Sequence, residues 1–100
     1  MAMTSREFHI SLGDPSPPAG LPPLVAALWW EGKGNWEQAH EIAQSDENGK
    51  DAAWVHAYLH RRQGDISNAG YWYRRAGRPA ATTSLEAEWA AIALALLAEP

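Results

Sequence analysis

Apolar residues recur at spacings of three and four from residue 21 onward, which is the period of an α-helix with a buried face. The segment Leu21–Lys33 is apolar on every side, as is typical of a helix that lies centrally or is covered by a partner. A broad apolar face also marks the segment near Lys50–Gln63, and its side chains are Trp54, Val55, Tyr58 and Leu59. The pattern predicts five helices, which begin near Leu21, Asn35, Lys50, Asp65 and Ser84.

Residues that start helices support these boundaries. Asn35 is followed three positions later by Gln38, which is the spacing of a capping box, and Thr83 with Glu86 repeats it. Asp65 is placed to cap the fourth helix directly after Gly64. We expect the fourth helix to bury Ile66, Ala69, Tyr73 and Ala76.

Residues 1–20 have a different character. Three prolines between positions 15 and 18 forbid a regular helix there. Phe8, Ile10 and Leu12 alternate with polar residues, a pattern that suits a short extended piece lying on the domain or on a partner. We therefore expect a flexible or extended tail over residues 1–20 and a single helical domain over residues 21–100.

Composition changes this picture in two ways. The chain is poor in Leu, Ile, Val and Phe but holds six Trp and three Tyr among many Ala residues, so we expect large rings to fill gaps between closely packed helices. It has no Cys, which excludes disulfides and Cys-ligated metals. No membrane span or secretory leader is expected, so a cytoplasmic protein is the default. The net charge of −4 argues against nucleic acid as the main partner.

Two segments of the chain match each other at a fixed offset. The residues Ala27, Gly34, Asn35, Trp36 and Ala39 align with Ala57, Gly64, Asp65, Ile66 and Ala69. In both, a Gly ends one helix, an Asx residue caps the next, and a small Ala lets two antiparallel helices touch. Repeated helical hairpins of this kind stack into solenoids.

The two segments together resemble known repeat families over roughly Leu24–Arg78, and the second segment carries the match. Gly64, Asp65 and Ala69, followed by Tyr73 and Ala76, resemble the second helix of a tetratricopeptide repeat, and Ala69-x-x-Trp72-Tyr73-x-x-Ala76 resembles its Sel-like relatives. The segments 54–61 and 71–75 also resemble a group of short uncharacterised bacterial proteins. The resemblance implies an all-α fold of two antiparallel helical hairpins with a C-terminal capping helix, and a surface that receives a protein or peptide.

His56 and His60 are the candidate metal ligands. They lie four residues apart, so both rings project from one side of the third helix, the side opposite Trp54 and Tyr58. Such a pair can hold Zn²⁺ with a carboxylate or His40 as third ligand. The alternative is two surface imidazoles that only make hydrogen bonds. Ala57 stands where a metalloprotease motif requires Glu, so that motif is absent. We expect no structural metal and no cofactor, because folding does not depend on closing a metal site.

Catalysis finds little support in the sequence. Ser45, Ser67 and Ser84 lie at turns or caps, where hydroxyls bind the local backbone. We therefore expect a protein that is not an enzyme.

Aromatic and arginine side chains outside the helix stripes indicate a partner surface, because Trp, Tyr and Arg anchor protein interfaces. The alternative is that the rings replace missing Leu in the core. The candidate contact residues are Trp29, Trp30, Tyr71, Trp72, Arg75, Leu94 and Leu97. We expect a protein-interaction module that forms a homodimer. The alternative function is a small metal- or ligand-binding protein that uses His56 and His60, and a nucleic-acid binder comes third.

Overall fold

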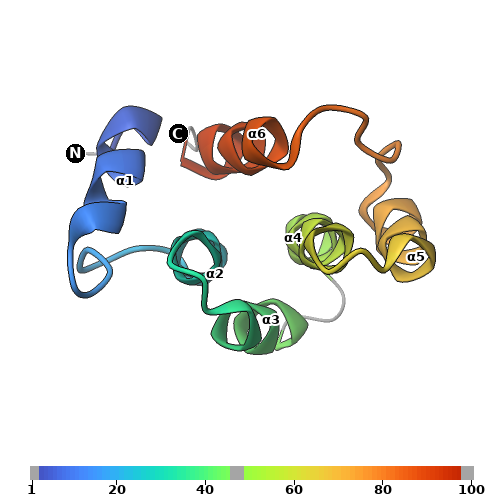
Figure 1. Ribbon diagram of the computed structural model, residues 1–100, viewed down its shortest axis with the longest axis horizontal. Coiled ribbons are helices and arrows are strands. Elements are labelled where there is room, and N and C mark those ends of the chain that lie inside the picture. Colours follow the sequence, from blue (N-terminus) through green and yellow to red (C-terminus); the bar gives the residue numbers. More distant parts are fainter. Residues whose placement is uncertain (1–2, 46–48, 98–100) are drawn as a thin grey trace.

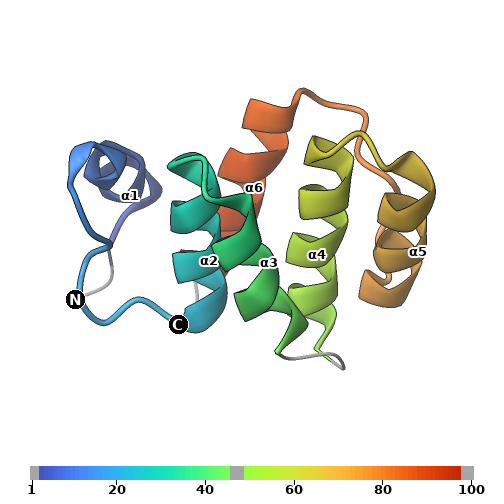
Figure 2. The same ribbon diagram turned by 60° about the horizontal axis from the view of Figure 1, so that its bottom comes forward.

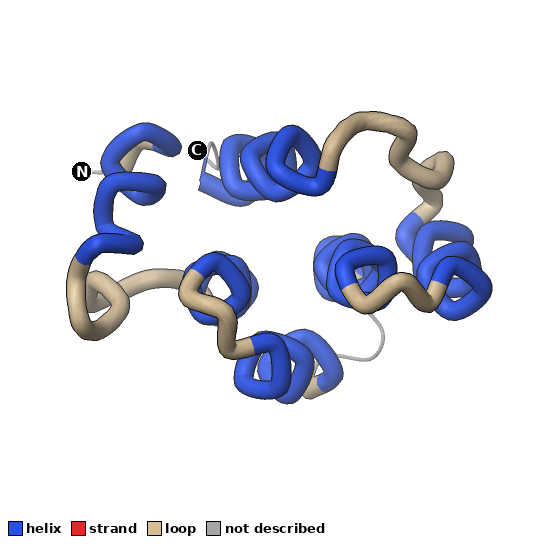
Figure 3. Tube along the Cα trace, in the orientation of Figure 1, coloured by secondary structure: helices blue, strands red, loops and turns tan. Residues whose placement is uncertain are grey.

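The computed structural model describes residues 3–45 and 49–97, and these residues form an all-helical fold without strands (Figure 3). The predicted fold class is confirmed at this level. The elements are α1 (Ser5–Ile10), the 3-10 helix η1 (Ser11–Gly13), α2 (Pro23–Gly32), α3 (Trp36–Gln44), α4 (Lys50–Arg62), α5 (Ile66–Ala76) and α6 (Leu85–Leu97). None of these helices is long and apolar enough to cross a membrane.

Helix α4 is the centre of the fold. It contacts α2, α3, α5 and α6, and it lies between α3 and α5 in both ribbon views (Figures 1 and 2). Every residue from Ala52 to Leu59 is buried, so more than two turns of α4 have no side open to water. The predicted apolar helix α2 is likewise covered within the chain, because it packs on α3, α4 and α6.

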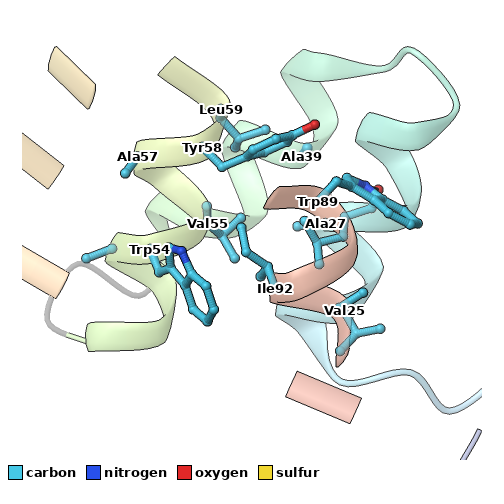
Figure 4. Packing of buried hydrophobic residues seen from close by; sticks show 14 of the residues in the cluster. Val25, Ala27, Ala39, Trp54, Val55, Ala57, Tyr58, Leu59, Trp89 and Ile92 are labelled. Carbon is cyan, nitrogen blue, oxygen red and sulfur yellow. Dashed lines mark hydrogen bonds between the residues drawn. The ribbon is translucent and has the colours of Figure 1, made fainter. Parts of the chain in front are cut away.

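The core combines large rings with alanines at the helix contacts. Val55 of α4 faces Ile92 of α6, and Ala27 of α2 lies beside them (Figure 4). The largest side chains that are fully buried are Trp29, Tyr58, Phe8, Leu28, Leu59 and Ile92. One predicted core position is wrong: Ile66 is 66% exposed, because it is the first residue of α5 and projects beyond the contact with α4.

Side-chain caps fix where the helices begin. The Asn35 side chain accepts a hydrogen bond from the Gln38 amide at 3.1 Å, and Asp65 caps α5 in the same way. The predicted capping residue of α6, Thr83, was one residue too early. The Ser84 hydroxyl, rather than Thr83, accepts the amide of Ala87 at 3.0 Å.

The N-terminal segment is the main departure from the sequence-based expectation. Instead of a flexible or extended tail, Ser5–Ile10 is a helix with a Thr4–Glu7 capping box, and Phe8 is completely buried. The Phe8 ring stacks on Trp89 of α6 with 5.4 Å between centroids. Six residues are too few to show a helical period, so alternation along the sequence suggested the wrong local structure.

Polar contacts hold this segment on the domain. The Trp29 indole N–H donates to the Ser11 hydroxyl at 3.2 Å, and Lys33 Nζ donates to the Leu12 carbonyl at 2.7 Å. Trp89 is itself fixed, because its indole N–H donates to the Leu28 carbonyl at 2.9 Å. The segment is therefore part of the core rather than an appendage.

Two buried carboxylates connect the helices, and each is paired with a Tyr and an Arg. Glu88 of α6 accepts from Arg61 at 2.8 Å and from Tyr73 at 2.5 Å, which joins α4, α5 and α6. Glu31 of α2 accepts from the Tyr58 hydroxyl at 3.1 Å. The network satisfies these acids, and burial still raises the pKa of Glu31 above 4.5.

Substitution of Phe8 tests whether the N-terminal helix belongs to the core. We expect Phe8→Ala to lower the free energy of unfolding by about 3 kcal/mol or more, because it empties a filled site against Trp89. Ile10→Ala is the matched control, since Ile10 lies on the same helix and is 65% exposed; it should cost about 0.5 kcal/mol or less. Equal effects in chemical denaturation would contradict the docked position of α1.

Replacement of Glu31 tests the pH dependence of the buried carboxylate. A raised pKa in the folded state gives stability that is present below the unfolded pKa and is lost as pH rises through the folded pKa. Gln does not titrate, so the melting temperature of Glu31→Gln relative to wild type should rise between about pH 4 and about pH 8. Thermal melts at both ends of this range measure it, and a difference that falls with pH would contradict the assignment.

Candidate metal centre formed by three histidines

Three of the four histidines meet where α3 packs on α4. His56 and His60 lie one turn apart on α4, and their rings stack with 5.0 Å between centroids. His40 of α3 reaches the pair, so that its Nε2 lies 2.9 Å from Nε2 of His56. One ligand nitrogen from each ring lies within 4.8 Å of the other two. The three residues are called the histidine cluster below.

Two tryptophans enclose the histidine cluster. The Trp36 ring stacks on His40 at 4.7 Å between centroids, and the Trp72 ring stacks on His56 at 3.8 Å. Trp36 is held in turn by its indole N–H, which donates to the Leu59 carbonyl at 2.7 Å. The imidazoles are therefore fixed by aromatic faces and not by exposed loops.

The position of His56 corrects the sequence-based picture of a surface pair. His56 is only 5% exposed, and His40 and His60 are half-buried. The helical wheel correctly separates the histidines from Trp54 and Tyr58, but the side it leaves outside is covered. Because α3 and α5 both pack on α4, Trp72 of α5 closes over His56.

This environment keeps the imidazoles neutral. Burial, followed in order of size by the neighbouring His40, His60 and Arg75, lowers the pKa of His56 to about 4. Burial also lowers the pKa of His40 and of His60. A neutral imidazole has one nitrogen with a free lone pair, which is the form that binds a metal ion.

A carboxylate lies near His60. Asp65 Oδ2 is 3.9 Å from His60 Nδ1, and Asp65 also caps α5. This separation is too long for a hydrogen bond, so Asp65 acts on His60 through its charge, which opposes the lowering of the His60 pKa by burial. The sequence pattern indicated Asp65 only as a helix cap.

The donor set suits a divalent transition metal. Zinc–nitrogen bonds of about 2.0–2.1 Å place two ligand nitrogens of one tetrahedral ion about 3.3 Å apart. In the histidine cluster, Nε2 of His40 and Nε2 of His56 lie 2.9 Å apart, and the ligand nitrogens of all three rings lie within 4.8 Å of one another, so the observed separations bracket this spacing. Three histidines leave the fourth position of a tetrahedral ion to water or to another ligand.

The structure brings together only some of the predicted partner residues. Trp29 is fully buried in the core and is not available for a contact, which corrects that expectation. On α5, the Arg75 guanidinium lies over the rings of Tyr71 and Trp72 and donates to the Tyr71 hydroxyl at 3.0 Å. On α6, Leu94 is 57% exposed and Leu97 is half-buried, as is Trp30 on α2.

Comparisons with known proteins add no family to this description. A scan against protein-family models and searches of curated proteins and of solved structures found no match.

Proposed function

We propose that this protein binds a divalent transition-metal ion through His40, His56 and His60. The observation that supports the proposal is the convergence of three imidazoles from two helices, with one ligand nitrogen of each within 4.8 Å of the others. Imidazole is a good ligand for Zn²⁺, Ni²⁺ and Cu²⁺.

The electrostatics of the histidine cluster favour an ion over protons. Three imidazoles at this spacing repel one another when protonated, and their lowered pKa values keep them neutral near pH 7. Neutral rings need no deprotonation before they bind, so affinity is not reduced by competing protons at that pH.

The rigidity of the surroundings also supports the proposal. Stacking on Trp36 and Trp72 limits the rotation of His40 and His56, and both ligand-bearing helices are packed in the core. A preorganised ligand set loses little conformational entropy on binding. The half-buried His40 and His60 leave a route by which an ion reaches the cluster.

The competing explanation is a cluster held only by hydrogen bonds and ring stacking. His40 and His56 make one such bond in the structure. This explanation predicts no stoichiometric metal, so the two are separated by direct binding.

Zinc titration of the full chain tests the proposal. After treatment with a chelator, the wild type should stay folded, because its core is complete without an ion, and should then bind one Zn²⁺ per chain by calorimetry. Single substitutions His40→Gln, His56→Gln and His60→Gln should each weaken binding by roughly tenfold or more, since each removes one ligand. Zinc should also raise the melting temperature by mass action.

The matched control is His9→Gln. His9 is the fourth histidine, lies on α1, and is not in the histidine cluster. The His9→Gln variant should bind Zn²⁺ with the same affinity and stoichiometry as the wild type. Absence of one-to-one binding, or an equal loss in the control variant, would refute a metal site at the cluster.

Self-association is a second candidate function, and the observation that favours it is the exposure of large apolar side chains. Ile66 and Tyr71 on α5 and Leu94 on α6 are 66%, 43% and 57% exposed. We propose that α6, with Leu94 and Leu97, forms a contact between two copies of the chain, as in a two-fold interaction module.

The oligomeric state tests this second candidate. We expect the wild type to sediment as a dimer at tens of micromolar and Leu94→Glu to sediment as a monomer, because a charge at a buried contact is costly. A wild-type mass of 11.0 kDa would exclude self-association.

A further inference from the structure

A cavity of about 420 Å³ lies on the side of α4 that bears Tyr58 and Arg62, and none of its lining residues belongs to the histidine cluster. Its walls come from α1, α2, α4 and α6, so segments from both ends of the described chain border it, and it is open to solvent. The volume falls within the range of small-molecule sites.

One of the residues that line the cavity, Glu31, is a buried acid. The Glu31 side chain is 6% exposed, and Arg62 Nε lies 3.2 Å from its Oε2. The Arg62 side chain is 44% exposed, so it can turn toward a ligand while still lying near Glu31. The Glu86 carboxylate also lines the cavity and acts electrostatically on Glu31.

The lining is balanced in charge. Arg6, contributed by α1, and Arg62 line the cavity together with the acids Glu31 and Glu86. The two acids would repel a ligand that carries only negative charge, and the two arginines would repel a ligand that carries only positive charge. Complementarity is best for a ligand that carries both charges.

One wall of the cavity is apolar. Trp89 and Leu12 line it together with small alanines of α6. The backbone of α2 approaches this wall at Gly32, where a Cβ would lie 2.8 Å from Leu12 Cδ2 and 3.3 Å from Trp89 Cζ2. The missing side chain of Gly32 lets Leu12 and Trp89 pack directly on the α2 backbone, and the part of these two side chains that lines the cavity gives it an apolar wall.

We infer that this cavity binds a small zwitterion with an apolar side chain, of the class of the apolar α-amino acids. The ligand's ammonium group lies toward Glu31 and Glu86, its carboxylate toward Arg6 and Arg62, and its side chain against Trp89. The docked α1 helix is part of the site, because it supplies Arg6 and, through η1, Leu12.

Calorimetry on the full chain with defined probes tests this inference. L-Leucine, L-phenylalanine and L-tryptophan are compared with glycine, and we expect at least one of the three to bind with a Kd near or below about 1 mM. It should bind at least roughly tenfold more tightly than glycine, which lacks the apolar group.

Truncated probes isolate the two charges. 3-Phenylpropionate keeps only the carboxylate of phenylalanine and 2-phenylethylamine only the ammonium group, and each should bind more weakly than the best amino acid by roughly tenfold or more. Equal binding of either analogue, or no binding of any amino acid, would overturn the inference.

Variants then locate the site. Arg6→Gln and Glu31→Gln should each weaken binding of the best amino acid by roughly tenfold, the first with little risk to folding because Arg6 is exposed. Arg74→Gln and Glu41→Gln are the matched controls, since both residues are exposed and outside the cavity. An equal loss in the controls would place binding elsewhere. His56→Gln should leave amino-acid binding unchanged, so this result is independent of the zinc titration.

Discussion

The burial of α4 on all sides is the constraint on which the rest of the structure depends. A helix whose residues from Ala52 to Leu59 are all buried needs neighbours around its full circumference, and α2, α3, α5 and α6 supply them. The alanines of α4 let these helices approach closely, and Tyr58 and Trp54 occupy the wider spaces. A chain this poor in Leu and Ile reaches a filled core only through such a combination of large and small side chains.

Both candidate sites are consequences of this packing, because each lies where polar residues of α4 meet a neighbouring helix. On one side, α3 and α5 bring His40 and Trp72 to His56, and burial lowers the pKa of His56 and favours its neutral form. On the other side, α2 and α6 border the cavity that contains Glu31 and Trp89. Helix α4 lies between the two sites, and no residue belongs to both of them.

Sequence patterns predicted the features that are local to one helix. The capping residues Asn35 and Asp65 were read correctly, because a cap is set by residues three apart. The spacing of His56 and His60 correctly placed the two rings on one side of their helix. His40 was named as one possible third ligand beside this pair, and only the packing of α3 on α4 shows that its ring lies next to theirs.

Features that depend on contacts between distant segments were not predictable in this way. The burial of Phe8 depends on Trp89, which lies at the other end of the chain. Trp29 was expected at a partner surface, but it is covered by the N-terminal segment that was itself read as a tail. The incorrect assignment of residues 1–20 as a tail therefore led to the incorrect placement of Trp29 at the surface. The proposed repeat family and the stacking of hairpins stay predictions.

A metal ion shared by His40, His56 and His60 would be visible at each ring. Imidazole nitrogen NMR of the chain during zinc addition resolves this, because each ring reports its own lone pair. We expect nitrogen resonances of His40, His56 and His60 to shift together and reach their limit at one equivalent, while those of His9 do not move. Three cluster rings that stay unchanged at one equivalent of zinc would refute the shared site.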